Sequence, residues 1–468
     1  MSDYKATIGL EIHAEMNTKT KMFCACANNP FVAEPNTHIC SICTAQPGTL
    51  PAVNEQAVRN VLLVGTAVDG DLADFTEFDR KNYFYPDIPK AYQISQYKYP
   101  LVSNGSLGDV DLTRIHMEED TATSTHMDDY SLVDFNRAGV PLMELVTEPV
   151  IHDAETAMAF ARELQLLLRT LGVSGASLEK GEMRIEANIS VSKTDELGTK
   201  VEVKNLNSFK IVGSAIDYEI ARQIQVLENG EKVVQETRGW NETTSKTFSQ
   251  RSKETADDYR YFPDPDIPKY KLSELEGFDK ESLKSQLPEL PWEKRDRYAA
   301  MGIKSEAIEF FLQNPIYNNF IESLLSDNEK KNTLAANYLS SDLAGLEKGE
   351  AEGNIANIDV NELGFMLDMV MAGDLSSRGA KDMLAIMYRE GGAAESIANQ
   401  HGLIQKSDEG ELKIVAEKIL IDNPGQVEEY KNGNEKLLQY FVGQGMRVTK
   451  GSANPGMLAK VFKELLEQ

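Results

Sequence analysis

The chain has 468 residues, of which 41% are hydrophobic and 26% are charged, and its net charge is −26. This composition excludes a disordered chain and provides enough length for roughly two or three domains. The chain shows neither an apolar run of about eighteen residues nor a signal peptide, so we expect a cytoplasmic protein with no membrane partner. The negative charge argues against a general nucleic-acid binder, because such binding depends on clustered Lys and Arg.

Alternating apolar and polar residues predict β-strands through the first half of the chain. Because side chains alternate between the faces of a strand, Glu11 and His13 share one face of segment 8–16. Later segments repeat the pattern: 114–120 with His116 and Glu118, 142–148 with Glu144 and Glu148, 184–191 with Glu186, and 200–204 with Lys204. The last two segments, joined by a polar loop, predict a hairpin.

All four cysteines fall in a loop that follows the first strand: Cys24, Cys26, Cys40 and Cys43. Two close pairs joined by a loop are typical of a tetrahedral zinc site, and four Cys ligands leave no open position for catalysis. In a reducing compartment, metal is a better interpretation than disulfides. The spacing therefore predicts one structural Zn²⁺, with four separate buried thiols as the alternative.

Helical periodicity interrupts the strands and then replaces them. Helices are expected at 54–68, 153–171 and 208–227, and later at 361–372, 377–389 and 455–466. Strand signals end near Pro288 and Pro291, which mark a boundary. We therefore expect an α+β fold with an antiparallel sheet at 1–290, an all-helical connector at 291–403 and a small all-helical tail at 404–468.

Two segments of similar composition, 83–90 and 261–269, combine aromatic residues, prolines, acids and a lysine. The prolines exclude helix interiors and central strands. One interpretation is a pair of ordered loops pinned by their rings. The other is a pocket lining in which rings stack on a base and Lys meets phosphate, and both remain open.

The acidic strand faces predict metal chemistry. Carboxylates gathered on one face repel each other unless a cation neutralises them. Glu11, His13, Glu118 and Glu144 form a candidate site for Mg²⁺ or Mn²⁺, and the alternative is a solvated polar face. Neither a phosphate-binding glycine loop nor a Ser or Cys nucleophile motif is present, so ATP would be bound through metal, basic and aromatic residues.

Long motifs along the whole chain resemble the B-subunit family of the aspartyl/glutamyl-tRNA amidotransferases. They lie at 8–15 (IGLEIHAE), 78–87 (FDRKNYFYPD), 91–96 (AYQISQ), 116–120 (HMEED), 130–137 (YSLVDFNR), 204–209 (KNLNSF), 257–263 (DDYRYFP) and 450–455 (KGSANP). The resemblance implies ATP-dependent amidation of misacylated Glu-tRNA(Gln) or Asp-tRNA(Asn). ATP phosphorylates the side-chain carboxylate, and ammonia then displaces phosphate.

The resemblance also implies partners and an architecture. An amidase subunit, which is a glutaminase, would supply ammonia through a channel, and a small third subunit would complete a heterotrimer. The first domain would be an antiparallel cradle that holds the kinase and transamidase site, and the tail would touch tRNA. The cysteine cluster occurs in only part of the family, so zinc rests on the spacing.

Specific residues match the family's site. Glu11, His13, Glu118 and Glu144 correspond to its metal ligands, and Lys81, Tyr83 and Lys90 to the mouth of its ammonia path. We add Glu148, Glu186 and Lys204 as catalytic candidates from the polar strand segments. From residue 431 onward six Lys or Arg and three Glu give a net charge of +3, and the predicted tRNA contacts are Lys431, Lys436, Arg447, Lys450, Lys460 and Lys463.

Three alternatives remain. The related archaeal enzyme acts only on Glu-tRNA(Gln) and carries an inserted domain for which this chain is too short. A catalytically inactive, zinc-stabilised tRNA-binding scaffold is the non-enzymatic alternative, against which the acidic set argues. The basic tail can also be a solvated helical cap. The sequence does not choose between Glu-tRNA(Gln), Asp-tRNA(Asn) or both as substrates.

Overall fold

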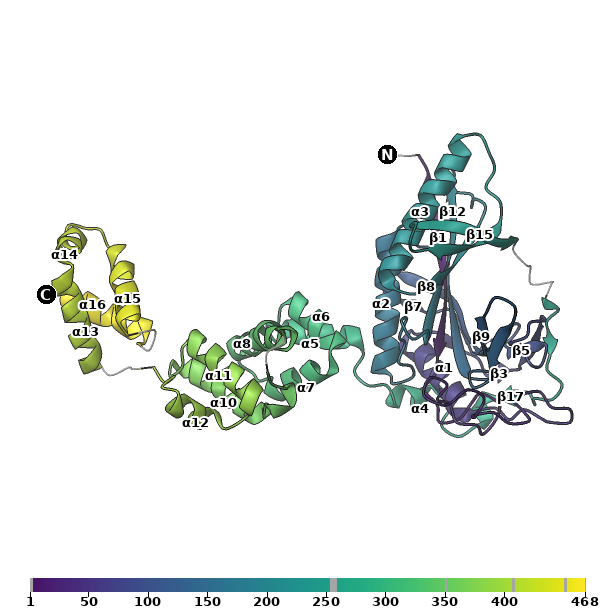
Figure 1. Cartoon of the computed structure of the whole chain (residues 1–468), viewed down its shortest axis with the longest axis horizontal. Helices are drawn as coiled ribbons and strands as arrows, with labels where there is room; N and C mark the ends of the chain where they lie inside the picture. Colours follow the sequence, from purple (N-terminus) through teal and green to yellow (C-terminus); the bar gives the residue numbers. More distant parts are fainter. Residues whose placement is uncertain (1–2, 253–258, 350–351, 406–408, 450–452, 468) are drawn as a thin grey trace. The chain divides into compact units, whose positions relative to one another are not determined.

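The computed structural model describes residues 3–252, 259–349, 352–405, 409–449 and 453–467 (Figure 1). The chain divides into two compact units, Met1–Pro291 and Trp292–Gln468. The first unit combines a large sheet with helices, and the second is built from helices, so the predicted α+β class is confirmed. No described helix has the length and apolarity needed to cross a membrane.

A ten-stranded sheet forms the frame of the first unit, with β1 (Lys5–Glu15) near its middle. The order is β15-β14-β13-β12-β1-β11-β8-β6-β2, with β7 beside β8, and of these pairs only β13–β14 is parallel within the described residues. The other strands are β2 (Asp71–Leu72), β6 (Val102–Ser103), β7 (Ser106–Leu107), β8 (Val110–Glu119), β11 (Pro141–Thr147), β12 (Met183–Ser192), β13 (Val201–Leu206), β14 (Glu236–Asn241) and β15 (Lys246–Ser252). The predicted hairpin is the antiparallel pair β12–β13.

Helices α2 (Ala154–Thr170) and α3 (Phe209–Glu228) lie along the same side of this sheet (Figure 1). Each begins at a predicted residue, because the side chains of Asp153 and Ser208 accept hydrogen bonds from the first-turn N–H groups. The apolar residues of β1, Ile8, Leu10 and Ile12, are at most 1% exposed. Since alternate side chains point to opposite faces, Glu11 and His13 lie on the other face of the sheet.

Smaller elements complete the first unit. Helix α1 (Glu55–Ala67) lies within the predicted range 54–68, and the side chain of Asn54 caps its first turn. The other elements are β3 (Phe75–Thr76), β4 (Asp79–Asn82), β5 (Tyr92–Ser95), β9 (Thr123–His126), β10 (Ser131–Asp134), β16 (Phe262–Pro263), β17 (Tyr270–Lys271), the 3₁₀ turn η2 (Leu272–Glu274) and α4 (Lys280–Ser285). They pair as the sheets β16-β4-β5, β9-β10 and β17-β3.

The second unit consists of helices with two separate hydrophobic clusters, one from Tyr298 to Ala398 and one from Leu412 to Leu466. Its elements are α5 (Pro291–Ala300), α6 (Ser305–Gln313), α7 (Pro315–Leu324), α8 (Glu329–Asn337), the π-helix η3 (Tyr338–Leu343), α9 (Ala344–Lys348), η4 (Ile355–Asn357), α10 (Val360–Ala372), α11 (Ser377–Glu390), α12 (Ala394–Gln400), α13 (Glu409–Asp422), α14 (Pro424–Lys431), α15 (Leu437–Val448) and α16 (Pro455–Leu466). The division into connector and tail near residue 404 stays a prediction.

Candidate active site

Strand register assembles a row of carboxylates and imidazoles on the polar face of the sheet. His13 on β1 lies opposite Glu144 on β11, and Glu144 in turn lies opposite His116 on β8. On the other side of β1, Glu11 lies opposite Glu186 on β12. Because directly opposed residues of antiparallel strands point to the same face, four strands contribute to one site.

Glu144 is the centre of this row. Its Oε2 lies 3.3 Å from His13 Nε2 and 3.4 Å from His116 Nε2. The ligand atoms of Glu11, His13 and Glu144 lie within 4.8 Å of one another, and so do those of His116, Glu118 and Glu144. Both clusters contain Glu144, so together they include all four predicted metal ligands.

His116 was missed as a ligand by the sequence analysis, although it shares the polar face of its segment with Glu118. The residue is 3% exposed, and its Nδ1 is buried without a hydrogen-bond partner. A buried ring nitrogen that bonds nothing is costly in a purely structural histidine. Carboxylate oxygens suit Mg²⁺ or Mn²⁺, and the predicted set is mostly oxygen with one imidazole, so the donor set fits the predicted metal.

The close approach of these ionisable side chains shifts their pKa values. Burial, together with the carboxylates of Glu144 and Glu186, raises the pKa of Glu11 to about 7. Burial also opposes ionisation of Glu144, but the imidazoles of His116 and His13 hold its pKa well below its usual range. Burial lowers the pKa of His13, yet its hydrogen bond to Glu144 and the neighbouring carboxylates together raise it to about 9. The carboxylates thus stabilise a positive charge placed between them, such as a protonated imidazole.

A second acidic group shares Glu11 with the first. The carboxylates of Glu11, Glu186 and Glu202 lie within 4.8 Å of one another. Lys204 Nζ lies 2.8 Å from Glu186 and 3.7 Å from Glu202. The structure therefore places two catalytic candidates, Glu186 and Lys204, in this group, and it adds Glu202, which the sequence analysis did not select.

The third candidate of this kind, Glu148, lies apart from these groups. The register is irregular between Val146 and Thr147, where β11 ends, so the alternation that relates residue 144 to residue 148 is lost. Its carboxylate accepts a hydrogen bond from Thr113 Oγ1 at 2.7 Å. Glu148 belongs to none of the three clusters of acidic and imidazole side chains found among the described residues.

Basic and aromatic side chains border the row next to β8. Lys81 Nζ lies 3.4 Å from Glu118, and Lys90 Nζ lies 2.6 Å from Glu119. The Tyr83 hydroxyl donates to Gln93 Oε1. Burial lowers the pKa of Lys81, but Glu118 and nearby groups raise it well above its usual value. Lys81 and Tyr83 therefore lie beside the acidic row, and Lys90 contacts the residue next to Glu118.

At this border each aromatic–proline segment contacts residues that lie close in sequence to the other segment. Strand β16 pairs with β4, the rings of Tyr83 and Tyr259 lie 5.7 Å apart, and Lys81 Nζ lies 5.3 Å from the Tyr259 ring centroid. Tyr97 stacks on Tyr261 at 4.5 Å. The segments are thus pinned by rings, as one interpretation held, and they also lie next to the acidic site, which leaves base stacking open.

The four cysteines converge in the loop that follows β1. The sulfurs of Cys24, Cys26, Cys40 and Cys43 all lie within 4.8 Å of one another, and none forms a disulfide. The hydrogen bond from Cys24 lowers the pKa of Cys43 to about 4, although burial opposes this. Four convergent sulfurs of this kind can hold a metal ion.

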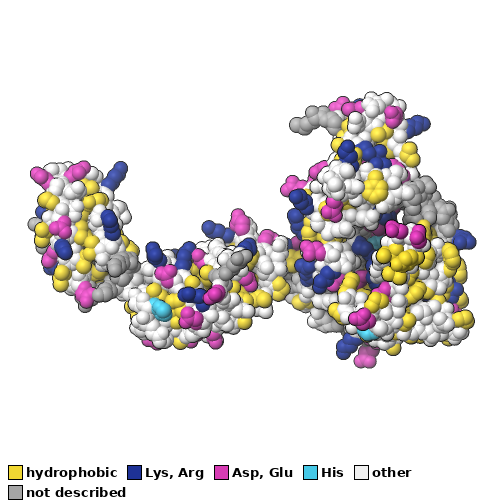
Figure 2. All heavy atoms as spheres, viewed as in Figure 1, with side chains coloured by type: hydrophobic (Ala, Val, Ile, Leu, Met, Phe, Trp, Pro, Cys, Tyr) yellow, Lys and Arg dark blue, Asp and Glu magenta, His cyan; other side chains and the backbone are white. Residues whose placement is uncertain are grey.

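The predicted tRNA-binding residues of the tail lie on several helices. Lys431 ends α14, Lys436 precedes α15, and Arg447 lies in the last turn of α15. Lys460 and Lys463 lie on α16, 3.8 Å from Glu464 and 3.9 Å from Glu467, and Lys450 is outside the described residues. Figure 2 shows basic and acidic side chains together on the visible face of this part.

Two N–H groups in the first turn of α16 are already hydrogen-bonded to a side chain. The side chain of Asn454 accepts hydrogen bonds from the N–H groups of Gly456 and Met457. These groups are satisfied within the helix. Binding of phosphate by this part of the chain would therefore rest on the basic side chains.

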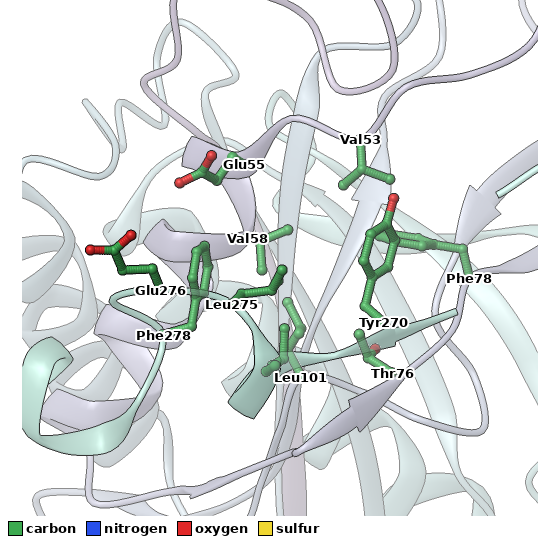
Figure 3. A pocket seen from close by; sticks show the side chains of 11 residues that line it. Val53, Glu55, Val58, Thr76, Phe78, Leu101, Tyr270, Leu275, Glu276 and Phe278 are labelled. Atoms are coloured by element: carbon green, nitrogen blue, oxygen red, sulfur yellow. The ribbon is translucent and has the colours of Figure 1, made fainter. Parts of the chain in front are cut away.

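A separate cavity of about 450 Å³ lies between the start of α1 and the segment 270–278 (Figure 3). Its lining is largely apolar, for example Val58, Phe78, Leu101 and Phe278, with Glu55 and Glu276 also present. None of the candidate site residues lines it. The cavity is therefore distinct from the carboxylate row.

Comparisons with known proteins cover nearly all of the chain. The family described as the GatB/GatE catalytic domain matches residues 6–276, and the family described as the GatB domain matches residues 319–466. Three proteins named as the B subunit of aspartyl/glutamyl-tRNA(Asn/Gln) amidotransferase are similar over their length. They come from Persephonella marina (40% identical, 99% of this chain and 100% of that protein), Dehalococcoides mccartyi (41%, 100% and 100%) and Brevibacillus brevis (42%, 100% and 99%).

Proposed function

The chain belongs to the B-subunit family of the aspartyl/glutamyl-tRNA(Asn/Gln) amidotransferases, and from this premise we propose that its carboxylate row activates the side chain of a misacylated tRNA. The substrates are Glu-tRNA(Gln), Asp-tRNA(Asn) or both. ATP transfers its γ-phosphoryl group to the side-chain carboxylate, which gives an acyl phosphate and ADP. Ammonia then attacks the acyl carbon, and phosphate leaves as the amide forms.

The observation that carries this proposal is the row built around Glu144. Glu11, His13 and Glu144 would hold one Mg²⁺ or Mn²⁺, with His116 and Glu118 bordering it, and Glu11, Glu186 and Glu202 offer a second position. When bound, the cation supplies neutralisation of phosphate charge. Glu11, His13 and Glu144 would fix its place, and His116 would orient Glu144.

The basic border would serve the reacting anions. Lys81 stays protonated beside Glu118 and can meet a phosphate oxygen or the substrate carboxylate. Lys204 offers a similar cation at the other end of the row. Tyr83 and Lys90 would line the entry of ammonia, as the resemblance implies. Sequestering these groups from water protects the acyl phosphate from hydrolysis.

Partners complete the reaction. We propose a heterotrimer that this chain forms with an amidase, which releases ammonia from glutamine, and with a small third protein. This chain shows no Ser or Cys nucleophile motif of its own, which fits that division of work. As a translation enzyme it would act in the cytoplasm.

Reconstitution tests the proposed reaction. The purified chain with its two partner proteins, ATP, Mg²⁺, ammonium chloride and Glu-tRNA(Gln) or Asp-tRNA(Asn) should form Gln-tRNA or Asn-tRNA, measured after deacylation and separation of the amino acids. Added ammonium bypasses the glutaminase, so the assay reports on this chain. The inactive-scaffold alternative predicts no amidated product from either tRNA, whatever the ATP concentration.

The cysteine cluster would hold one structural Zn²⁺. Thiolate–metal bonds supply folding free energy to a loop with little regular structure. Untagged protein purified without chelator should contain about one zinc per chain by elemental analysis. Cys43→Ser should reduce this content by more than half, whereas replacing exposed Ser41 by Ala should leave it unchanged. Wild-type protein without zinc would contradict the proposal.

A further inference from the structure

Lys21 lies in the loop that also holds the four cysteines, and among the described residues it is the one Lys or Arg with no exposed surface, at 0% exposure. Its Nζ donates to the carbonyl oxygen of Phe135 at 3.1 Å and lies 3.7 Å from the Sγ of Cys43. Among the described residues, no carboxylate lies within 4.0 Å of this ammonium group. Its nearest candidate counter-charge is therefore the sulfur cluster.

The charge of Lys21 distinguishes the states that the cysteines can adopt. A buried ammonium without an opposite charge strongly destabilises the folded state. Neutral thiols and disulfides provide no such charge, and a single thiolate at Cys43 provides only one negative charge beside Lys21. Four thiolates around one divalent cation carry a net charge of about −2, which an adjacent ammonium stabilises.

We propose that Lys21 is the buried counter-ion of a tetrathiolate metal centre. The inference rests on the proposed zinc site and assigns a function to a residue outside the four ligands. The backbone N–H of Cys40 also donates to Cys43 Sγ, at 3.1 Å, so two donors converge on one sulfur. Donors to a ligating thiolate withdraw charge from it and reduce repulsion among the sulfurs.

Lys21 also links the centre to the wall of the active site. Gly139 has a φ of +83°, and a Cβ placed there would lie 3.8 Å from atoms of Lys21, Cys43 and Glu119. Glu119 is the partner of Lys90. The cysteine cluster and the Lys90–Glu119 pair therefore pack around one glycine, and the stem of Lys21 packs against the same glycine as a positioning residue.

Zinc affinity tests the proposal on the purified full chain. The dissociation constant is measured by competition with a chromophoric chelator for wild type, Lys21→Met and Lys21→Arg. Lys21→Met, which removes the charge, should weaken zinc binding by about 10- to 100-fold. Lys21→Arg keeps the charge and should stay within about fivefold of wild type. The control is Lys19→Met, the same change at an exposed position, with an unchanged constant.

The difference in Tm between zinc-loaded and chelator-treated protein provides the second readout, and it should shrink in Lys21→Met. An equal fall in both Tm values, with zinc affinity within twofold of wild type, would make Lys21 a packing residue and overturn the proposal while zinc binding stands. If Lys21→Met does not fold, Lys21→Arg decides, because a tenfold loss of affinity in that variant contradicts a role of charge. Wild-type protein that binds no zinc overturns both proposals.

Discussion

Glu144→Gln is expected to lower kcat/KM for ATP-dependent transamidation by about 10³-fold or more, while the activity of the partner glutaminase stays largely intact. Gln keeps the shape of Glu and removes its charge. Glu144 lies next to His13 and His116 and belongs to two of the three clusters of acidic and imidazole side chains. Removing its charge therefore disturbs most of the proposed metal ligands. Initial rates of amide formation with saturating ammonium measure the effect.

Further variants separate charge from folding. Glu11→Gln should show a loss similar to that of Glu144→Gln, because Glu11 joins both metal positions. Glu179→Gln makes the same change at an exposed residue outside the site and should leave the rate within twofold of wild type. Unchanged circular dichroism and Tm would show that the variants fold. A Glu144→Gln enzyme within twofold of wild type would mean that the row does not bind the catalytic metal.

Local patterns predicted much of the first unit because they depend only on neighbours in sequence. Asp153 and Ser208 cap helices where expected, since an N-cap needs only the following turn. The period of two placed Glu11 and His13 on one face of β1. These features required no knowledge of which strands pair.

The remainder depends on strand register, which is set by tertiary packing. His116 and Glu202 join the site because β8 and β13 pair at particular offsets with β11 and β12, and an isolated segment does not encode those offsets. Glu148 is outside the clusters around Glu144, and the register is irregular between Val146 and Thr147, just before it. The role of Lys21 was equally hidden, since burial of a lysine beside a sulfur is visible only after folding.

Removal of residues 404–468 is expected to raise KM for aminoacyl-tRNA by about tenfold or more, while amidation at saturating tRNA stays measurable. A chain with a net charge of −26 repels RNA as a whole, so affinity must come from local basic groups. The tail has its own hydrophobic cluster, from Leu412 to Leu466, and none of its described residues belongs to the clusters of acidic and imidazole side chains at the active site. Its loss should therefore affect binding more than chemistry.

A charge variant of the intact chain makes this prediction specific. Lys431, Lys436 and Arg447 have no ion pair among the described residues, whereas Lys460 and Lys463 lie near glutamates of their own helix. Changing the first three to Gln should raise KM and make the dependence of log KM on log salt shallower, by about one unit for each phosphate that the protein no longer neutralises. The control changes exposed Lys280, Lys284 and Lys304 to Gln and alters the net charge equally. Equal effects of the two triple variants would show that total charge acts, and an unchanged KM after removal of the tail would show that this segment does not bind tRNA.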